Sequence, residues 1–160
     1  MPKAAMWFKR AADKGHRFAA RMLANAYFNG YGVTKDPNET LRLLRVAGAE
    51  PGDRDGSWAL ATMLLSGYGT GTDCENLDEV THQIHRAAFL GSQPAQCMLG
   101  REYAAQPPGP PSKLVPVDLP QALAWYRAAA AGPPGAEQTE ALAAIARLEA
   151  AGVVAMPLRL

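Results

Sequence analysis

One short segment carries the residue types and spacing of a metal site. Glu79, His82 and His85 follow one another at intervals of three residues, which would align them on one face of a helix. A Glu-x-x-His motif holds metals in helical bundles when facing helices supply a matching motif. The sequence contains no matching motif, so we predict that no metal binds here and that His85 is a partly buried structural residue.

The other reactive side chains form no recognisable catalytic group. Cys74 and Cys97 are too few for a disulfide framework and lie in no metal-ligand spacing, so we expect them not to be bonded to each other. No serine or cysteine stands in a nucleophile elbow. The glycine-rich segment 67–71 is typical of a turn rather than of a phosphate-binding loop. The sequence therefore predicts that the protein is not an enzyme and needs no cofactor.

The composition is that of a chain that can bury a core. Of its 160 residues 48% are hydrophobic and 19% are charged, and the formal net charge is +1. Such a chain is not expected to be disordered, and without a basic cluster it is not expected to bind nucleic acid. No apolar run is long enough to span a membrane, and the amino terminus lacks the apolar run of a secretory signal. These features predict a cytoplasmic protein if Met1 is the natural start, and a periplasmic or secreted one stays open if the chain has been trimmed.

Two ladders of similar residues recur along the chain at intervals of about 40 residues, which is typical of a repeat protein. The first ladder consists of Leu23, Leu60 and Leu99. The second consists of Arg45, Arg86 and Arg127, each preceded by bulky residues and followed by small ones, with Trp7–Ala12 as a fourth copy. Two ladders with nearly the same period indicate that the chain is built from repeated units.

Each unit is expected to contain two helices. Ala20, Leu23, Ala24 and Tyr27 have the spacing of one helical face, and Gly30 then ends the helix. No segment alternates as a strand would, so the sequence predicts an all-α solenoid of about eight helices in a single domain over residues 1–160. The helices are expected at residues 4–15, 19–30, 38–49, 56–67, 76–90, 94–105, 118–131 and 137–151, with a proline-rich insertion at 106–117.

The order of aromatic, small and glycine residues resembles the Sel-one-like repeat, a bacterial-type relative of the tetratricopeptide repeat. The residues that fill this pattern are Ala4, Trp7, Phe8, Ala11, Ala12, Gly15, His16, Ala20, Leu23, Ala24, Tyr27, Gly30, Gly32, Val33 and Asp36. The resemblance implies a right-handed superhelix of antiparallel helix pairs that serves as an adaptor for other proteins. Some bacterial members carry a disulfide in each repeat and are linked to penicillin binding. This chain lacks that cysteine spacing.

The ends of the chain depart from the repeat. Trp7–Lys14 is a second helix without its first partner, and residues 137–151 are a first helix without its second. Both helices are therefore expected to expose apolar surface. Either the tail Val153–Leu160 folds back as a cap, or the ends are available for self-association.

The resemblance also implies that the first helix of each pair lines a concave groove. The helix positions opposite the core ladder are Arg21, Asn25 and Phe28 in the first repeat, Trp58, Thr62 and Leu65 in the second repeat, and Cys97, Arg101 and Ala104 in the third repeat. Arg21, Asn25 and Arg101 have side chains that could hold a peptide backbone or a carboxylate, and Trp58 one that could fill a pocket. We predict a groove formed by Arg21, Asn25, Phe28, Trp58, Thr62 and Arg101.

These residues predict a scaffold or adaptor that binds a protein or peptide partner in its groove. Two alternatives stay open from the sequence. One is a penicillin-binding or hydrolase-like activity, as linked to some family members. The other is an immunity or regulatory protein that blocks one enzyme.

Overall fold

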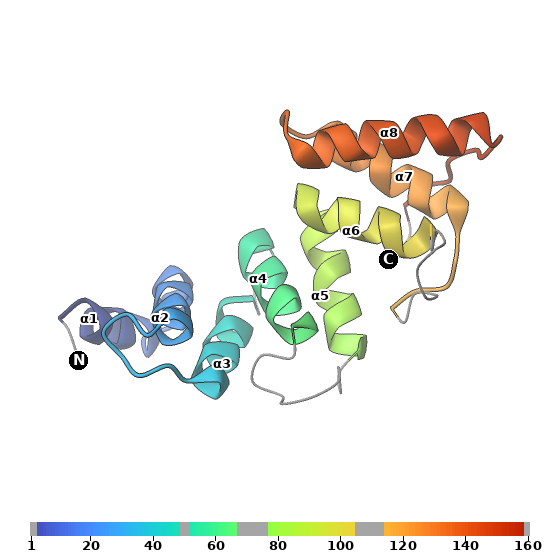
Figure 1. Ribbon diagram of the computed structural model, residues 1–160. Coiled ribbons are helices and arrows are strands. Elements are labelled where there is room, and N and C mark those ends of the chain that lie inside the picture. The colour runs from blue at the N-terminus through green and yellow to red at the C-terminus, as the bar shows by residue number, and fades with distance from the viewer. Residues whose placement is uncertain (1–2, 49–51, 67–76, 105–113, 159–160) are drawn as a thin grey trace. The chain divides into compact units, whose positions relative to one another are not determined.

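The computed structural model describes residues 3–48, 52–66, 77–104 and 114–158 (Figure 1). Over these residues it contains eight α-helices and no strand, which confirms the predicted all-α solenoid. The helices are α1 (Lys3–Ala12), α2 (Arg17–Asn29), α3 (Pro37–Gly48), α4 (Arg54–Leu65), α5 (Leu77–Phe89), α6 (Gln93–Ala104), α7 (Leu119–Ala130) and α8 (Ala136–Ala150). Two compact units, Met1–Asn76 and Leu77–Leu160, divide them, and each unit is described by itself. We call α2, α4, α6 and α8 first helices and α1, α3, α5 and α7 second helices.

Neighbours in sequence are also neighbours in space within the first unit. Helix α1 packs on α2, α2 on α3, and α3 on α4. The predicted core ladder is confirmed here, because Leu23 and Leu60 are 2% and 1% exposed. Small residues such as Ala20, Ala47 and Ala61 are fully buried between the helices. Side chains of this size let helix backbones approach closely, and burial of their apolar surface stabilises the stack.

Glycine and aspartate residues set where the helices of the first unit end and begin. Gly30 ends α2 in the left-handed conformation (φ +77°), which a residue with a Cβ rarely adopts. The Asp36 carboxylate accepts the backbone N–H groups of Asn38 and Glu39 at 3.0 and 3.1 Å. Asp53 caps α4 in the same way, at 2.9 Å from the Gly56 nitrogen. Each cap satisfies an N–H group that has no partner within the helix.

The core of the second unit lies between α6, α7 and α8, with α5 packed on α6. Trp125 on α7 is 0% exposed, and the Phe89 and His85 rings of α5 meet it edge to face at 5.0 and 6.2 Å. Gly100 lets α6 approach α7, since a Cβ there would lie 2.8 Å from the Tyr126 ring. Leu99, the third member of the leucine ladder, is 1% exposed, as predicted.

The C-terminal tail folds back on the second unit. Val153 and Ala155 pack against its core, and the Gln121 side chain donates a 2.7 Å hydrogen bond to the Pro157 carbonyl. The C-terminal end is therefore capped by the tail, which is one of the two alternatives predicted for the ends. Helix α1 exposes apolar surface as predicted, with Trp7 61% and Met6 39% exposed.

Most of the predicted proline-rich insertion lies outside the described residues, and of its described part Val115 is buried and Val117 is exposed. None of the helices that the structure describes combines the length and the apolar character needed to cross a membrane.

Candidate functional site

Arg21 links two first helices of the first unit. Its guanidinium lies 3.3 Å from the Asp55 carboxylate and 3.7 Å from that of Asp53, both at the start of α4. The same guanidinium lies over the Phe18 ring, 5.6 Å from its centre, and that ring is 65% exposed. The predicted groove residue therefore already has carboxylate partners, and it holds α2 and α4 together on the side away from the leucine ladder.

Asn25 and Phe28 lie on the exposed side of α2, one and two turns beyond Arg21. The Asn25 side-chain oxygen accepts a 2.7 Å hydrogen bond from the amide nitrogen of Asn29, which also donates to the Asn25 carbonyl at 3.0 Å. Phe28 is 38% exposed. Residues 21, 25, 28 and 29 share one face of a helix, because three and four residues span about one turn. Two amides and one aromatic ring thus lie together opposite the core.

Trp58 and Thr62 are partly buried on α4. The Thr62 hydroxyl lies 3.0 Å from the carbonyls of Trp58 and Ala59, so it bonds to its own helix. Asp55 precedes Trp58 by three residues, which places the partner of Arg21 one turn before the indole on the same side of α4. Arg21, Asn25 and Phe28 from α2 and Trp58 and Thr62 from α4 therefore belong to one unit.

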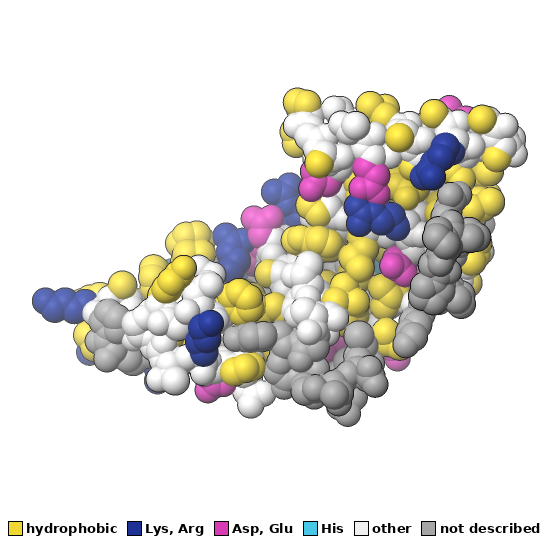
Figure 2. Space-filling model, viewed as in Figure 1, with side chains coloured by type: hydrophobic (Ala, Val, Ile, Leu, Met, Phe, Trp, Pro, Cys, Tyr) yellow, Lys and Arg dark blue, Asp and Glu magenta, His cyan; other side chains and the backbone are white. Residues whose placement is uncertain are grey.

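Arg101 belongs to the second unit and binds a carboxylate there. Its guanidinium forms two hydrogen bonds to the two oxygens of Glu140 on α8. These bonds lower the pKa of Glu140 below its ordinary value. On the face shown in Figure 2, basic and acidic side chains adjoin where α6 and α8 lie. Each unit therefore has an arginine that joins two consecutive first helices.

Two of the positions expected to face the groove are buried instead. Cys97 is 1% and Ala104 is 7% exposed, and both contribute to the core of the second unit. The Cys97 thiol donates to the Glu137 carbonyl of α8 at 3.2 Å, and burial raises its pKa to about 11. The prediction was wrong because α8 packs over this side of α6. Cys97 is a free thiol, and Cys74 lies outside the described residues.

His85 has the structural role that the sequence predicted. It is 8% exposed, and its Nδ1 lies 2.9 Å from the Thr81 carbonyl, which can only accept a hydrogen bond. The other ring nitrogen, Nε2, is then free to accept the Tyr103 hydroxyl at 3.1 Å. Among the described residues, no group of three or more His, Cys, Asp or Glu side chains is arranged to hold a metal ion.

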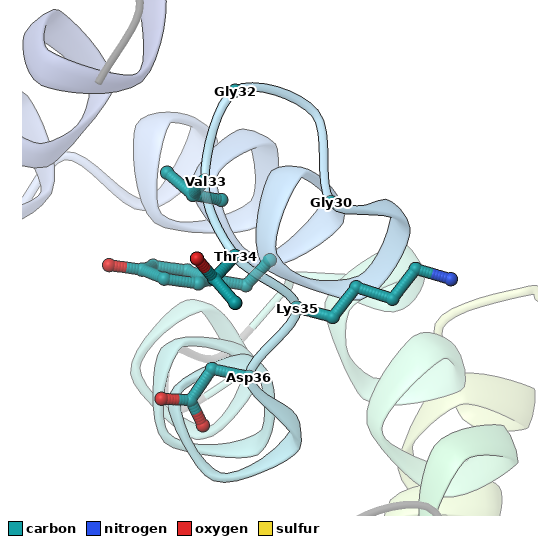
Figure 3. Close-up of a pocket in the computed structure, with 7 residues that line it drawn as sticks. Gly30, Gly32, Val33, Thr34, Lys35 and Asp36 are labelled. Atoms are coloured by element: carbon teal, nitrogen blue, oxygen red, sulfur yellow. The ribbon is translucent and has the colours of Figure 1, made fainter.

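The loop between α2 and α3 borders an open surface hollow of about 670 Å³ (Figure 3). It is lined by Tyr27, Gly30, Gly32, Val33, Thr34, Lys35 and Asp36. In Figure 3 the loop arches over the Val33 and Thr34 side chains while Lys35 extends away from them. The Asp36 carboxylate accepts two backbone hydrogen bonds that cap α3. The hollow is thus a consequence of the turn that connects the two helices of a repeat.

Sequence reasoning missed the acidic partners of the two arginines. Asp55 and Glu140 each lie on the next first helix along the chain. A search for opposite charges at equivalent faces of successive first helices would have found both pairs.

Comparison with known proteins identifies the repeat. The family model for the Sel1 repeat matches residues 1–16, 17–50 and 93–133. A Sel1 repeat protein from Oxalobacter formigenes is similar in structure, with a TM-score of 0.75, 29% sequence identity and coverage of 97% of this chain and 41% of that chain. A protective antigen of uropathogenic Escherichia coli strains with an SLR fold has a TM-score of 0.64 and 22% identity, over 92% of this chain and 33% of that chain. No curated protein matches the sequence significantly.

The chain spans less than half the length of both solved structures. The family model matches more than half of the chain. The second repeat, which replaces the usual aromatic pair with Ile84 and His85, lies outside the matched residues. The chain belongs to the Sel1 repeat family.

Proposed function

We propose that this chain is a scaffold or adaptor that binds an extended polypeptide segment on α2 and α4, the first helices of its first unit. The residues assigned to this role there are Arg21, Asn25, Phe28, Trp58 and Thr62, and Arg101 is assigned a binding role within the second unit taken by itself. The Sel1 repeat fold is generally a scaffold for protein–protein interaction, and such solenoids are typically not enzymes. That general role supports a protein partner for this chain as well.

The observation that carries the proposal is the amide pair on α2. A side-chain amide offers both donors and an acceptor, which match the C=O and N–H groups of an extended peptide. The bond between Asn29 and Asn25 uses one amide nitrogen and one amide oxygen. The Asn25 NH₂ group and the Asn29 oxygen are left to meet a peptide backbone. Phe28 lies beside them and supplies an apolar contact.

The charges on these helices favour a partner segment of low net charge. Arg21 is neutralised by Asp55, and Arg101 by Glu140, within their own units. A strongly acidic segment would have to displace these carboxylates, which removes most of the gain from the new ion pair. Apolar side chains of the partner would instead pack on Phe28 and Trp58, since aromatic residues supply much of the binding energy at interfaces.

Selection from a displayed library of random peptides tests the proposal. We expect selected peptides to share apolar residues and low net charge. Asn25→Ala and Trp58→Ala should each weaken binding of a selected peptide, by about tenfold for the amide and more for the indole. Binding is measured by isothermal titration calorimetry, alongside a thermal melt of each variant.

Asn38→Ala is the matched control, because Asn38 is exposed on the second helix α3. It should bind as the unaltered chain does. Recovery of no specific peptide, or equal affinities of the Asn25 and Asn38 variants, would refute a first-helix site. Turnover of a reporter ester or a β-lactam by the unaltered chain would favour the catalytic alternative.

A further inference from the structure

Trp7 stands at a repeat position that is buried in all the other second helices. The equivalent residues are Leu43 in α3, Ile84 in α5 and Trp125 in α7, which are 3%, 0% and 0% exposed. Trp7 is 61% exposed, and α1 packs chiefly on α2. Trp125 is covered in part by Phe89 of α5, the second helix of the preceding repeat. A second helix placed as α5 is placed against α7 would therefore cover part of the Trp7 ring.

The α7–α8 end of the chain presents the surface that such a helix packs against. A second helix packs on its own first helix and on the second helix before it, as α7 does on α6 and α5. Beyond α8, the corresponding surface is formed by α8 and α7. No helix follows α8 among the described residues, and Val153 and Ala155 of the tail lie against this core instead. The Val153 and Ala155 side chains are themselves partly exposed there.

We propose that α1 of one copy docks on the α7–α8 end of a second copy, in place of the C-terminal tail. Helix α8 of one copy and helix α1 of the other then form one complete repeat, and Trp7 is buried at their contact. The two copies use different surfaces, so the contact continues into a linear or closed assembly rather than a symmetric pair. This interface is separate from the peptide-binding residues proposed above.

The simplest alternative is that α1 of one copy packs against α1 of the second copy. Charge disfavours this contact. Helix α1 carries Lys3, Lys9 and Arg10 and no acidic residue, so two such helices would repel each other. Helix α8 carries three glutamates and one arginine. Two of these glutamates already pair with arginines of their own unit, so repulsion between two α1 helices is the stronger part of the argument.

Sedimentation equilibrium of the full chain tests the interface. We expect concentration-dependent association that Trp7→Ser weakens about thirtyfold, as for loss of a central interface tryptophan. The double change Val153→Asp with Ala155→Asp releases the tail and leaves α7 and α8 unaltered. It should strengthen association at least tenfold, and Trp7→Ser should reverse that gain. Tyr31→Ser is the matched control, because Tyr31 is 67% exposed and lies outside α1.

A tail-release variant that remains monomeric, or a Trp7 variant that associates as the control does, would overturn the proposal. Cross-linking decides the question without altering the tail. A photoreactive aromatic residue replaces Trp7 in a mixture of ¹⁴N- and ¹⁵N-labelled chains. Isotopically mixed cross-links from position 7 to residues 119–150 would support the proposal. Mixed cross-links to residues 3–12, cross-links within one copy only, or no cross-links would each refute it.

Discussion

Leu60 lies in the middle of α4 and is 1% exposed, at the position that Leu23 and Leu99 hold in the other first helices. Leu60→Ala removes buried methyl groups and leaves a cavity, so it should lower the free energy of unfolding by about 2–5 kcal/mol. Urea denaturation followed by circular dichroism measures this change. Leu142→Ala is the control, because Leu142 is 54% exposed on α8 and its loss should cost less than about 0.5 kcal/mol. Equal stabilities of the two variants would contradict the leucine ladder.

Glu140 should make stability depend on pH in the acidic range. Its hydrogen bonds to Arg101 lower its pKa, so the unfolded chain protonates this carboxyl at a higher pH than the folded chain does. The stabilisation is therefore complete above the ordinary value of about 4.5 and is lost as pH falls through the lower, folded-state pKa. Because the pair is exposed, the effect should be at most about 1 kcal/mol.

The test for Glu140 measures the urea concentration at the midpoint of unfolding. It is measured at neutral pH and at pH values below the folded-state pKa of Glu140. The unaltered chain should lose more stability over this range than Glu140→Gln, which has no carboxyl to protonate. Glu149→Gln, which breaks the pair with Arg127, shows how much of the effect is common to any exposed pair. An identical pH dependence of the unaltered chain and Glu140→Gln would show that the Arg101 bond does not affect folding.

The leucine ladder could be predicted because its spacing reflects the repeat itself. Cys97 and Ala104 were misassigned for a physical reason. The repeat spacing identifies equivalent positions in successive helices. It does not show which neighbouring helix covers each of these positions. In the second unit α8 covers it. The partners of Arg21 and Arg101 also depend on contacts between helices more than 30 residues apart, as the separations of 34 and 39 residues show.

At the scale of the helices, Gly100 sets the distance between α6 and α7. A Cβ at this position would lie 2.8 Å from Tyr126, whose ring is 3% exposed and has little room to move. Gly100→Ala should therefore lower the free energy of unfolding by about 1–3 kcal/mol. In a Tyr126→Leu background the clash is absent. The same change should then be neutral or stabilising by up to about 1 kcal/mol, because alanine favours helix. Thermal melts of the four chains form the double-mutant cycle, and additive effects would contradict a steric origin.

The helices themselves follow from local signals that the sequence displays, such as Gly30 after α2 and the aspartates that cap α3, α4 and α7. The tail shows the limit of such signals. Its sequence allowed a cap or an open end, because Val153 and Ala155 are apolar enough for either. Only their contact with the core and the Gln121 bond to Pro157 distinguish the two.

For the molecule as a whole, stability should vary along the chain because each helix depends on its neighbours. Helix α1 packs chiefly on α2, whereas α7 packs on both α6 and α8. We expect the backbone amides of α1 to exchange with solvent deuterium faster than those of α7, since α1 can open without disturbing another pair. Native-state hydrogen exchange with mass spectrometry measures this difference. Equal protection of the two helices would indicate that α1 does not open independently.

The two arginine bridges lie where dissolved ions can reach them. Arg21 with Asp55, and Arg101 with Glu140, tie consecutive first helices on their exposed side. Dissolved ions screen such exposed pairs over about 8 Å at physiological ionic strength and over shorter distances in concentrated salt. The buried leucines and alanines on the other side of the same helices are not weakened in this way. Within each unit, we therefore expect added salt to weaken the tie between the first helices on their exposed side, while the buried contacts on the other side are retained.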